Sequence, residues 1–371
     1  FVRGYDTCLG AENVHLLNSE YIGSFPKRYG GLRVPRYLFR HAENVAGDVG
    51  AGFVNLPVLK EFFRAARLKA EVGRIRWEGH GCLYFVGYAA TYPIVTALKF
   101  AKKCFPDSVC CLIVPDLPQY MELSEKGAGF LHRIKNRVIG RGMRGMDCYV
   151  PLTAAMAPCL GADLTRCAVV EGIADISDVV PAGLPVDGLP ERYILYTGTL
   201  QYKYGIGDLL FAFKRVVDRG IGLVICGDGE AVDEIRSMQS KDPRVRYLGV
   251  LPSEEIARLR AGATVLVNPR KNEGEYTKFS FPSKMMEYLA SGVPTVAYKL
   301  DGMPDDYEGL FIDAARDGLG AAIERALRMG PEEIACLTAR ARKFVLEEKC
   351  PELQCEKTLE LLRKEAETNA R

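Results

Sequence analysis

The sequence lacks the patterns that mark metal-binding and disulfide-stabilised proteins. Its 12 cysteines include no C-x-x-C pair, and its 4 histidines are scattered, so the ligand spacing of a zinc site is missing. Cys110 and Cys111 are neighbours in an apolar run, which is typical of buried thiols in a reducing compartment. We therefore expect neither a resident metal nor a disulfide framework.

Long apolar runs and an excess of one charge are missing as well. No segment approaches the ~18 uninterrupted apolar residues of a transmembrane helix, and no signal peptide opens the chain. The formal net charge of +2 does not favour nucleic acid as a partner. Of the residues, 48% are hydrophobic and 26% are charged, which is typical of a soluble, cytoplasmic protein. The length of 371 residues favours two domains.

The second half of the chain alternates short, continuous apolar segments with amphipathic ones. A parallel sheet covered by helices on both faces produces this pattern, because its strands are buried on both sides. The pattern predicts a doubly wound, Rossmann-like α/β domain. Its strands are expected over 193–198, 222–230, 245–252, 263–269 and 295–298.

The first half repeats the pattern more loosely. Strands are predicted over 13–17, 81–87, 109–115, 147–153 and 167–172, and helices over 57–71, 91–104, 128–142 and 153–160. The stretch 176–190 is rich in Pro and Gly and is the natural linker. We expect an N-terminal domain over 1–180, a C-terminal domain over 181–345, and a final helix over 346–371 that returns to the first domain. The opening residues, from Phe1, read as the end of a helix, so a preceding strand and loop are expected to be missing.

One short segment, SFPSKMMEYLASGVP, begins at Ser280 and has the ends of a helix. Ser280 is a candidate N-cap, and Gly292 suits a left-handed cap after the last turn. Ser283 and Glu287 are four residues apart and therefore share one face of the helix. A buried helix does not need this face to be polar. The positive end of such a helix is a natural anion site. The alternative is a simple cap followed by a solvated ion pair between Lys284 and Glu287.

Five stretches of the second half occur in an order that is specific as a set: YTGTLQYKYGIGDLLFAF, VICGDGE, RYLGVLPSEEIARL, VNPR and SFPSKMMEYLASGVPTVA. With them the sequence resembles the C-terminal half of GT-B glycosyltransferases, above all the large retaining family four that builds bacterial capsular and exopolysaccharides. The first half resembles the acceptor domain of the same family through IGSFPKR, FVNLPVLKEF, IVPDLPQYM and VVEGIAD. The resemblance implies two Rossmann-like, doubly wound domains that face a central cleft.

The resemblance also implies a nucleotide-sugar donor bound to the second domain. Ser283 and Lys284 would hold the diphosphate, and Glu287 would accept hydrogen bonds from both ribose hydroxyls. The bare backbone at the end of the first strand would let a phosphate approach closely, and the loop after the third strand would read the nucleobase through backbone groups. The expected donor-binding positions are Gly198, Thr199, Lys203, Val250, Leu251, Ser283, Lys284 and Glu287.

Catalytic roles are expected for Asp116, Arg270 and Lys284. Asp116 follows an apolar strand in the first domain and could orient the acceptor hydroxyl or take its proton. An aspartate beside a proline also organises turns, and this alternative stays open. The guanidinium of Arg270 could hold the diphosphate bidentately, or could belong to a surface loop.

The sequence departs from the family at three positions. Phe279 stands where the family commonly has the first of two glutamates, and Thr199 and Tyr204 stand where it has an arginine and a lysine. Other cations must then neutralise the leaving diphosphate. The candidates are Lys203, Arg270, Lys278 and Lys284.

A basic segment in the first domain indicates where the acceptor lies. No acidic residue occurs between Lys126 and Asp147, and apolar residues recur there at helical spacing. This pattern fits contact with an anionic leaflet at the inner face of the cell membrane, and so a lipid-linked saccharide acceptor. A solvated outer helix is the alternative. The basic residues are Arg133, Lys135, Arg137, Arg141 and Arg144.

The resemblance implies transfer with retention and without a divalent metal or other cofactor. No D-x-D pair, which a metal-bound diphosphate would favour, occurs in the chain. Stabilisation of the departing phosphate by cations would then supply much of the catalytic effect. Two other interpretations stay open: a catalytically silent GT-B-fold binding or scaffold subunit, and a sugar-nucleotide epimerase.

Overall fold

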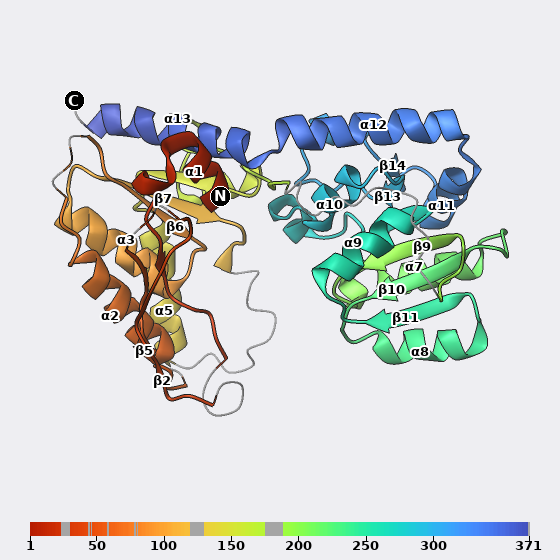
Figure 1. The fold of residues 1–371 in the computed structure, drawn as a ribbon, viewed down its shortest axis with the longest axis horizontal. Helices are drawn as coiled ribbons and strands as arrows, with labels where there is room; N and C mark the ends of the chain where they lie inside the picture. Colours follow the sequence, from red (N-terminus) through yellow and green to blue (C-terminus); the bar gives the residue numbers. More distant parts are fainter. Residues whose placement is uncertain are drawn as a thin grey trace. The chain divides into compact units, whose positions relative to one another are not determined.

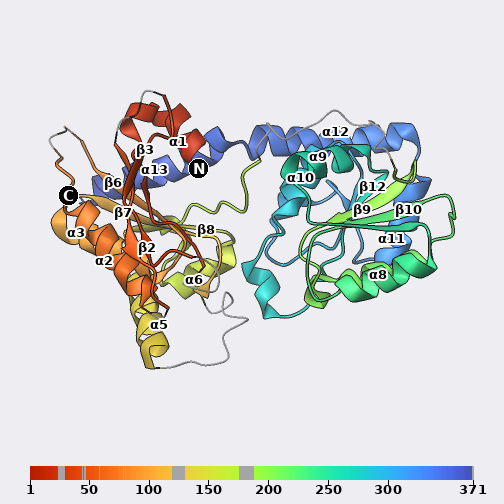
Figure 2. The same cartoon turned by 60° about the horizontal axis from the view of Figure 1, so that its bottom comes forward.

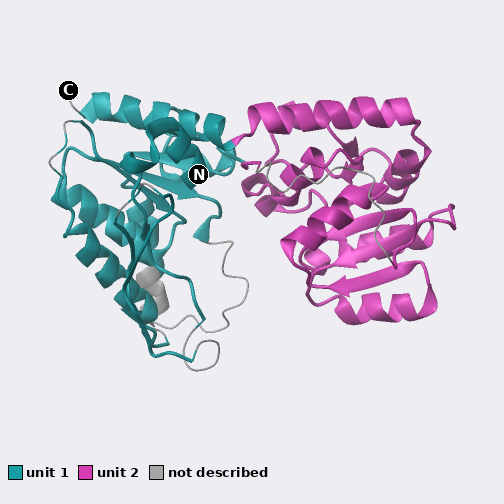
Figure 3. Cartoon of the chain, viewed as in Figure 1, with its two compact units in different colours: residues 1–171, 351–371 teal, residues 172–350 magenta. Residues whose placement is uncertain are grey.

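Figure 1 shows the chain as a computed structural model. It describes residues 1–23, 30–43, 45, 47–57, 59–77, 79, 81–118, 130–174 and 188–369, with the backbone alone at 130–135. The chain divides into two compact units (Figure 3). Unit 1 is Phe1–Glu171 with Pro351–Arg371, and unit 2 is Gly172–Cys350. Residues 176–187 of the predicted linker lie outside the described residues.

Unit 2 contains one sheet of six parallel strands in the order β11-β10-β9-β12-β13-β14. The first strand in sequence lies in the middle, and the order reverses beside it, which is the doubly wound arrangement predicted from the sequence. The five predicted strands are confirmed, and the short β14 was not predicted. The strands are β9 (Tyr193–Thr197), β10 (Gly222–Cys226), β11 (Val245–Gly249), β12 (Val265–Asn268), β13 (Thr295–Ala297) and β14 (Ile312–Asp313).

Helices cover both faces of this sheet (Figure 2). On one face α7, α8 and α11 bury a core around Phe213 and Leu223, and on the other α9 and α10 bury a second core around Leu195 and Tyr288. The helical elements are η5 (Tyr202–Tyr204), α7 (Ile206–Lys214), α8 (Val232–Lys241), α9 (Ser253–Gly262), η6 (Glu275–Phe279), α10 (Lys284–Ala290), η7 (Asp305–Tyr307), α11 (Leu319–Arg328) and α12 (Pro331–Glu348).

Unit 1 is less regular. Its parallel sheet β6-β7-β8 is built from two β-α-β units, with α3 and α5 as crossovers. A separate sheet, β1-β4-β3, combines a parallel and an antiparallel pair, and β2 pairs with β5. The strands are β1 (Leu17–Asn18), β2 (Arg33–Val34), β3 (Tyr37–Phe39), β4 (Asp48–Gly50), β5 (Phe53–Val54), β6 (Tyr84–Tyr88), β7 (Val109–Val114) and β8 (Cys148–Pro151).

The last helix of the chain belongs to this unit, where α13 packs against α1 and along β7 and β8. The Cβ of any larger residue at Gly4 would meet the Pro351 carbonyl oxygen at 2.4 Å, so the two helices approach closely at that point. The helical elements are α1 (Val2–Leu9), η1 (Ala11–Asn13), α2 (Lys60–Val72), α3 (Tyr92–Cys104), α5 (Phe130–Met143), η2 (Ala154–Met156), α6 (Ala157–Leu160), η3 (Leu164–Arg166) and α13 (Pro351–Asn369).

Two strand predictions in this unit are wrong. Residues 11–13 form a 3-10 helix, so only Leu17 of the predicted strand 13–17 is extended in a ladder. Residues 167–172 make only an isolated bridge, between Cys167 and Tyr149, although the N–H groups of Ala168 and Val170 donate to the carbonyls of Tyr149 and Pro151. The sequence also gave no sign of β2 to β5, which are two or three residues long and too short for a periodic pattern.

Candidate functional site

The first strand of the second sheet ends at Thr197, and Gly198 and Thr199 follow it. The Thr197 backbone N–H donates to the Tyr288 hydroxyl at 3.0 Å, which fixes the strand end against α10. Burial raises the pKa of Tyr288 to about 12, so this hydroxyl keeps its proton at neutral pH. Thr199 is exposed beyond this anchored end. The strand end is thus anchored to α10, and Thr199 beyond it faces solvent while Leu200 is buried.

Backbone hydrogen bonds of glycines join the ends of neighbouring strands. Gly198 N–H donates to the Cys226 carbonyl at 3.0 Å, and Gly227 N–H donates to the Gly249 carbonyl at 2.7 Å. Gly227 has φ 137°, and a Cβ there would lie 1.8 Å from the Gly198 carbonyl oxygen. This close approach explains Gly227 without a ligand. Two positions expected to read a nucleobase follow Gly249: Val250, 75% exposed, and the half-buried Leu251.

The helix at the opening of the SFPSK segment begins later than the sequence suggested. Its N-cap is Ser283, and α10 runs from Lys284 to Ala290. Ser280 is not the N-cap, because it ends η6 and its hydroxyl accepts from Arg270 Nη2 at 2.9 Å. Gly292 has φ 80°, so the predicted left-handed glycine after the last turn is confirmed. Ser283 is exposed and makes no side-chain capping bond.

Glu287 lies between two cations. Its Oε2 accepts from Arg260 Nη1, and Lys284 Nζ lies 3.0 Å from its Oε1. Arg260 comes from α9 and is only 6% exposed, whereas Glu287 is 39% exposed. The ion pair with Lys284 that the sequence left open is therefore present, together with a buried partner that the sequence did not reveal. A carboxylate has about four acceptor positions, so Glu287 retains capacity on its open side.

Arg270 follows β12 and lies beside the loop that follows β9. Its guanidinium carbon is 5.3 Å from the centre of the Tyr204 ring and 5.2 Å from that of Tyr276. Lys203 is exposed, and its Nζ lies 4.8 Å from the centre of the same Tyr204 ring. Two of the predicted donor-side cations thus share one aromatic neighbour.

The first-domain candidate, Asp116, lies in unit 1, two residues beyond the buried strand β7. Its side chain is exposed. The donor-side candidates from Gly198 to Glu287 all lie in unit 2.

Comparison with known proteins bears on the second unit most directly. Residues 191–329 match the family described as Glycosyl transferases group 1. Glycogen synthase from Thermus thermophilus is 30% identical over 168 residues, which cover 42% of this chain and 36% of that protein. D-inositol 3-phosphate glycosyltransferase from Corynebacterium glutamicum is 28% identical over 175 residues, covering 41% and 40%. The matches thus span well under half of these curated relatives.

Solved structures extend the likeness to both units. Sucrose-phosphate synthase from Thermosynechococcus elongatus has a TM-score of 0.66 at 14% identity, over 97% of this chain and 91% of that one. The fold is GT-B. Trehalose-6-phosphate synthase OtsA has a TM-score of 0.64 at 12% identity, over 89% and 88%. At such identities the likeness concerns the GT-B fold alone, and the group 1 match lies within its second domain.

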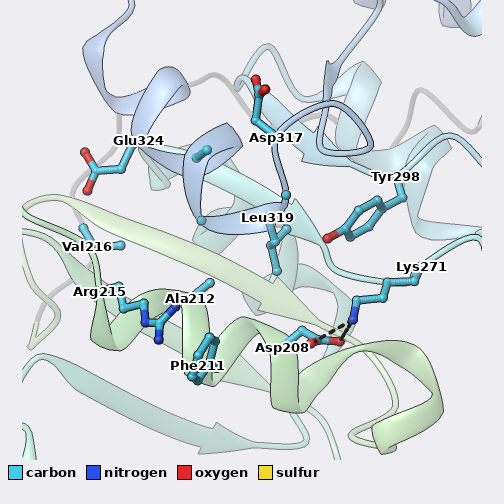
Figure 4. A pocket seen from close by; sticks show the side chains of 13 residues that line it. Asp208, Phe211, Ala212, Arg215, Val216, Lys271, Tyr298, Asp317, Leu319 and Glu324 are labelled. Carbon is cyan, nitrogen blue, oxygen red and sulfur yellow. Dashed lines mark hydrogen bonds and ion pairs between the residues drawn. The ribbon is translucent and has the colours of Figure 1, made fainter.

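Unit 2 of this GT-B chain also holds a surface pocket of about 370 Å³ (Figure 4). Its walls come from α7, from the start of α11 and from the residues after β12 and β13. Lys271 Nζ pairs with Asp208 at 3.0 Å across it, and this contact raises the pKa of Lys271. None of the predicted donor-binding residues lines it. The lining residues are Asp208, Phe211, Ala212, Arg215, Val216, Lys271, Tyr298, Asp317, Gly318, Leu319, Gly320, Ala321 and Glu324.

In the part of the chain that the structure describes, no group of three or more His, Cys, Asp or Glu side chains could hold a metal ion. Within the same residues, no helix combines the length and the apolar character needed to cross a membrane.

Sequence reasoning missed the contacts that four side chains make with the predicted donor-binding region: those of Arg260, Tyr276, Ser280 and Tyr288. Each contacts a predicted site residue or its strand from a distant or irregular segment. Tyr288 had a visible signal, because it is an aromatic residue next to Glu287 in the same helix. The pairing of Arg260 had none, since its partner is 27 residues away.

Proposed function

We propose that this protein transfers a sugar from a nucleoside diphosphate donor to a saccharide acceptor. The observation that supports this most is the set of strand-end groups in unit 2, within the segment that matches the group 1 family. Gly198, Arg270 and Glu287 all follow or flank the carboxyl ends of one parallel sheet, where ligands bind in doubly wound domains. The Anabaena Alr3699/HepE structure, a neighbour with a TM-score of 0.58, was solved in complex with UDP.

The pairing of Glu287 is compatible with a role in ribose binding. Arg260 is buried and holds one face of the carboxylate, so it orients Glu287 without covering it. The exposed part of the carboxylate then accepts from two ribose hydroxyls, while backbone groups of Val250 and Leu251 contact the base. Lys284 and Ser283 lie one turn away, on the side where the diphosphate would be. In this proposal the cations stabilise charge as the sugar–phosphate bond breaks.

We propose further details of the donor sugar, the stereochemistry and the acceptor. The sugar is a hexose, transfer proceeds with retention and without a divalent cation, and Asp116 orients the acceptor hydroxyl. The acceptor is a lipid-linked saccharide in the synthesis of a capsular or other exopolysaccharide. Product anomeric configuration determined by NMR tests retention, and rates measured with and without EDTA test the metal.

Titration of the donor site tests the central claim. The protein should bind at least one of UDP, GDP and ADP at millimolar concentration in calorimetry. Glu287→Gln keeps the shape but weakens charge-assisted bonds worth roughly 1.5–3 kcal/mol, so affinity should fall at least about tenfold. Lys284→Ala should lower turnover more than affinity, because charge on the leaving group grows as the bond breaks.

A matched variant separates binding from stability at the same ion pair. Arg260→Met removes the buried cation but leaves the carboxylate of Glu287 in place. It should lower the melting temperature and weaken nucleotide binding less than Glu287→Gln does. If Glu287→Gln binds donor like the parent, or differs only in melting temperature, Glu287 is a structural partner of Arg260 and the ribose role is wrong.

Contact with an anionic membrane surface is a further part of this proposal. Arg137, Arg141 and Arg144 are exposed on α5 and the turn after it. Vesicles with anionic lipid should sediment the protein weakly and with strong salt dependence, and the triple change of these arginines to Glu should abolish it. The same charge reversal at Arg316, Arg328 and Lys343, exposed cations of unit 2, is the control. Equal sedimentation of the two triple variants would contradict the membrane contact.

A further inference from the structure

Arg270 is held between two aromatic rings that come from different segments. Tyr204 belongs to η5, after β9, and Tyr276 belongs to η6, after β12. Both ring centres lie within the ~6 Å at which a guanidinium is attracted to an aromatic face, at 5.3 and 5.2 Å. A long, otherwise mobile side chain is therefore restricted to one position.

The backbone brings these rings together. Gly205 has φ 83°, and a Cβ there would lie 2.1 Å from the Pro269 carbonyl oxygen. Only glycine tolerates this contact, and it places Tyr204 next to the residue that follows Pro269, which is Arg270. The Tyr276 hydroxyl donates to the Lys203 carbonyl at 3.5 Å, which ties η6 to η5. The clamp, defined as Tyr204, Tyr276 and Ser280, is thus built into the fold of unit 2.

One of the five N–H donors of the guanidinium is buried without a partner in the described part of the chain. Nη2 donates to Ser280 Oγ at 2.9 Å. Nε is buried and has no hydrogen-bond partner among the described residues. Buried donors are almost always paired, because an unpaired one loses its hydration without compensation. A planar guanidinium with an unpaired Nε–H and a fixed orientation suits an anionic oxygen.

The other cations expected near the diphosphate are placed differently. Lys284 is paired with Glu287 at 3.0 Å. Lys203 is exposed, and its Nζ lies 4.8 Å from the centre of the Tyr204 ring. Tyr204 itself stands where a lysine would be expected from the resemblance. The charge that this lysine would carry is therefore supplied from the end of another strand, by Arg270.

We propose that Arg270 is a diphosphate-binding cation of this site in addition to Lys284, that its Nε–H binds a phosphate oxygen, and that Tyr204 and Tyr276 are positioning residues that hold its guanidinium for that contact. The inference rests on the proposed function, because it assigns a role within the same donor site. It replaces the arginine and lysine of the β9 loop with one clamped arginine.

The test compares nucleoside diphosphates with their monophosphates, because the variants should lose the contact between Arg270 and the diphosphate and keep the other contacts to the nucleotide. Dissociation constants are measured by calorimetry for UDP, GDP and ADP and for UMP, GMP and AMP. Arg270→Lys keeps the charge but removes the fork and the stacking, and should reduce the preference for diphosphate at least about tenfold. Tyr204→Leu with Tyr276→Leu should reduce it about fivefold, with monophosphate affinity nearly unchanged.

Two companion variants separate positioning from general damage. Tyr204→Phe keeps the ring and should keep most of the preference for diphosphate that the double leucine variant loses. Phe211→Leu removes a comparable pair elsewhere in unit 2, where Arg215 lies 3.9 Å from the Phe211 ring centre, and should keep the parent's preference. Melting temperatures of all variants are recorded, and Arg270→Gln replaces Arg270→Lys if the latter does not fold.

The outcomes distinguish this inference from the function on which it rests. If the parent protein binds none of the three diphosphates, the proposed function fails and the clamp's role falls with it. If the parent prefers a diphosphate and the Arg270 and double tyrosine variants keep that preference, the inference alone is wrong. If Tyr204→Phe loses as much of the diphosphate preference as the double leucine variant does, positioning by the ring is wrong.

Discussion

The two units of this chain are stabilised in different ways. Unit 2 has one continuous parallel sheet between two apolar cores, and all five residues of β9 and of β10 are buried. Unit 1 has two separate three-stranded sheets and a β2–β5 pair. Its irregular half is fastened by buried charged side chains, among them Asp48 at 0% and Arg64 at 6% exposure. Figure 3 gives the extent of each unit.

The polar contacts of unit 1 join segments that the sheets do not. Arg64 on α2 donates to the Ser19 carbonyl at 2.5 Å and to the Ser19 hydroxyl at 3.0 Å. Asp48 on β4 accepts from the backbone N–H groups of Leu16 and His41, each at 2.8 Å. These bonds hold loops in place where strands are only two or three residues long. Unit 2 should therefore be most sensitive to lost volume, and unit 1 to lost polar partners.

The largest effect is expected in the core of unit 2. Phe213 is 0% exposed and packs between α7 and the sheet, so Phe213→Ala should cost about 4 kcal/mol of unfolding free energy. Phe211, on the same helix and 54% exposed, is the matched control, and Phe211→Ala should change stability by less than about 0.5 kcal/mol. Urea unfolding gives the free energies. Hydrogen exchange followed by peptide should show faster opening of β9 and β10 than of β7.

A somewhat smaller effect is expected from a single polar side chain in unit 1. Asp48→Ala leaves two backbone donors and the His41 ring without their acceptor, and should cost about 3 kcal/mol. Asp107→Ala, at an exposed turn of the same unit, is the control. Exchange should accelerate around β1 and β4. If Asp48→Ala were as mild as Asp107→Ala, unit 1 would not depend on its polar contacts, and the comparison between the units would fail.

The same difference explains how far the sequence alone was informative. The strands of unit 2 are continuous apolar runs, so the local pattern predicted five of them, and it predicted α10 although not the residue at which this helix begins. The short strands from Arg33 to Val54 carry no period, and the contacts that position them join residues about 30 apart, such as Leu16 and Asp48. The site followed the same rule. Glycines at strand ends could be predicted. The pairing of Arg260 with Glu287 and the rings around Arg270 could not, because these contacts form only in the folded chain.

The smallest effect expected is a change of stability with pH that belongs to unit 1. His41 Nδ1 lies 2.7 Å from Asp48 Oδ2, and its Nε2 lies 3.1 Å from Asp6 Oδ1 on α1. Burial alone would lower the pKa of His41, but hydrogen bonds and charge from Asp48 and Asp6 outweigh it and raise the pKa above 6.5. Burial would likewise raise the pKa of Asp48, yet its bonds to Leu16 and His41 lower it below 3.8. Both carboxylates therefore face a protonated ring at mildly acidic pH.

The sign of the pH dependence follows from the raised pKa of His41. The folded state binds this proton more tightly than the unfolded state, so the contribution is complete below pH 6.5 and is lost as pH rises through the folded-state value. Urea midpoints measured between pH 5.5 and 9 should fall with rising pH in the parent, and the fall should be smaller in His41→Gln. His15→Gln, at an exposed histidine of the same unit, should fall as the parent does. Equal slopes for the parent and His41→Gln would show that the ring carries no proton between its two carboxylates, and that unit 1 is fastened by Asp48 through its backbone contacts alone.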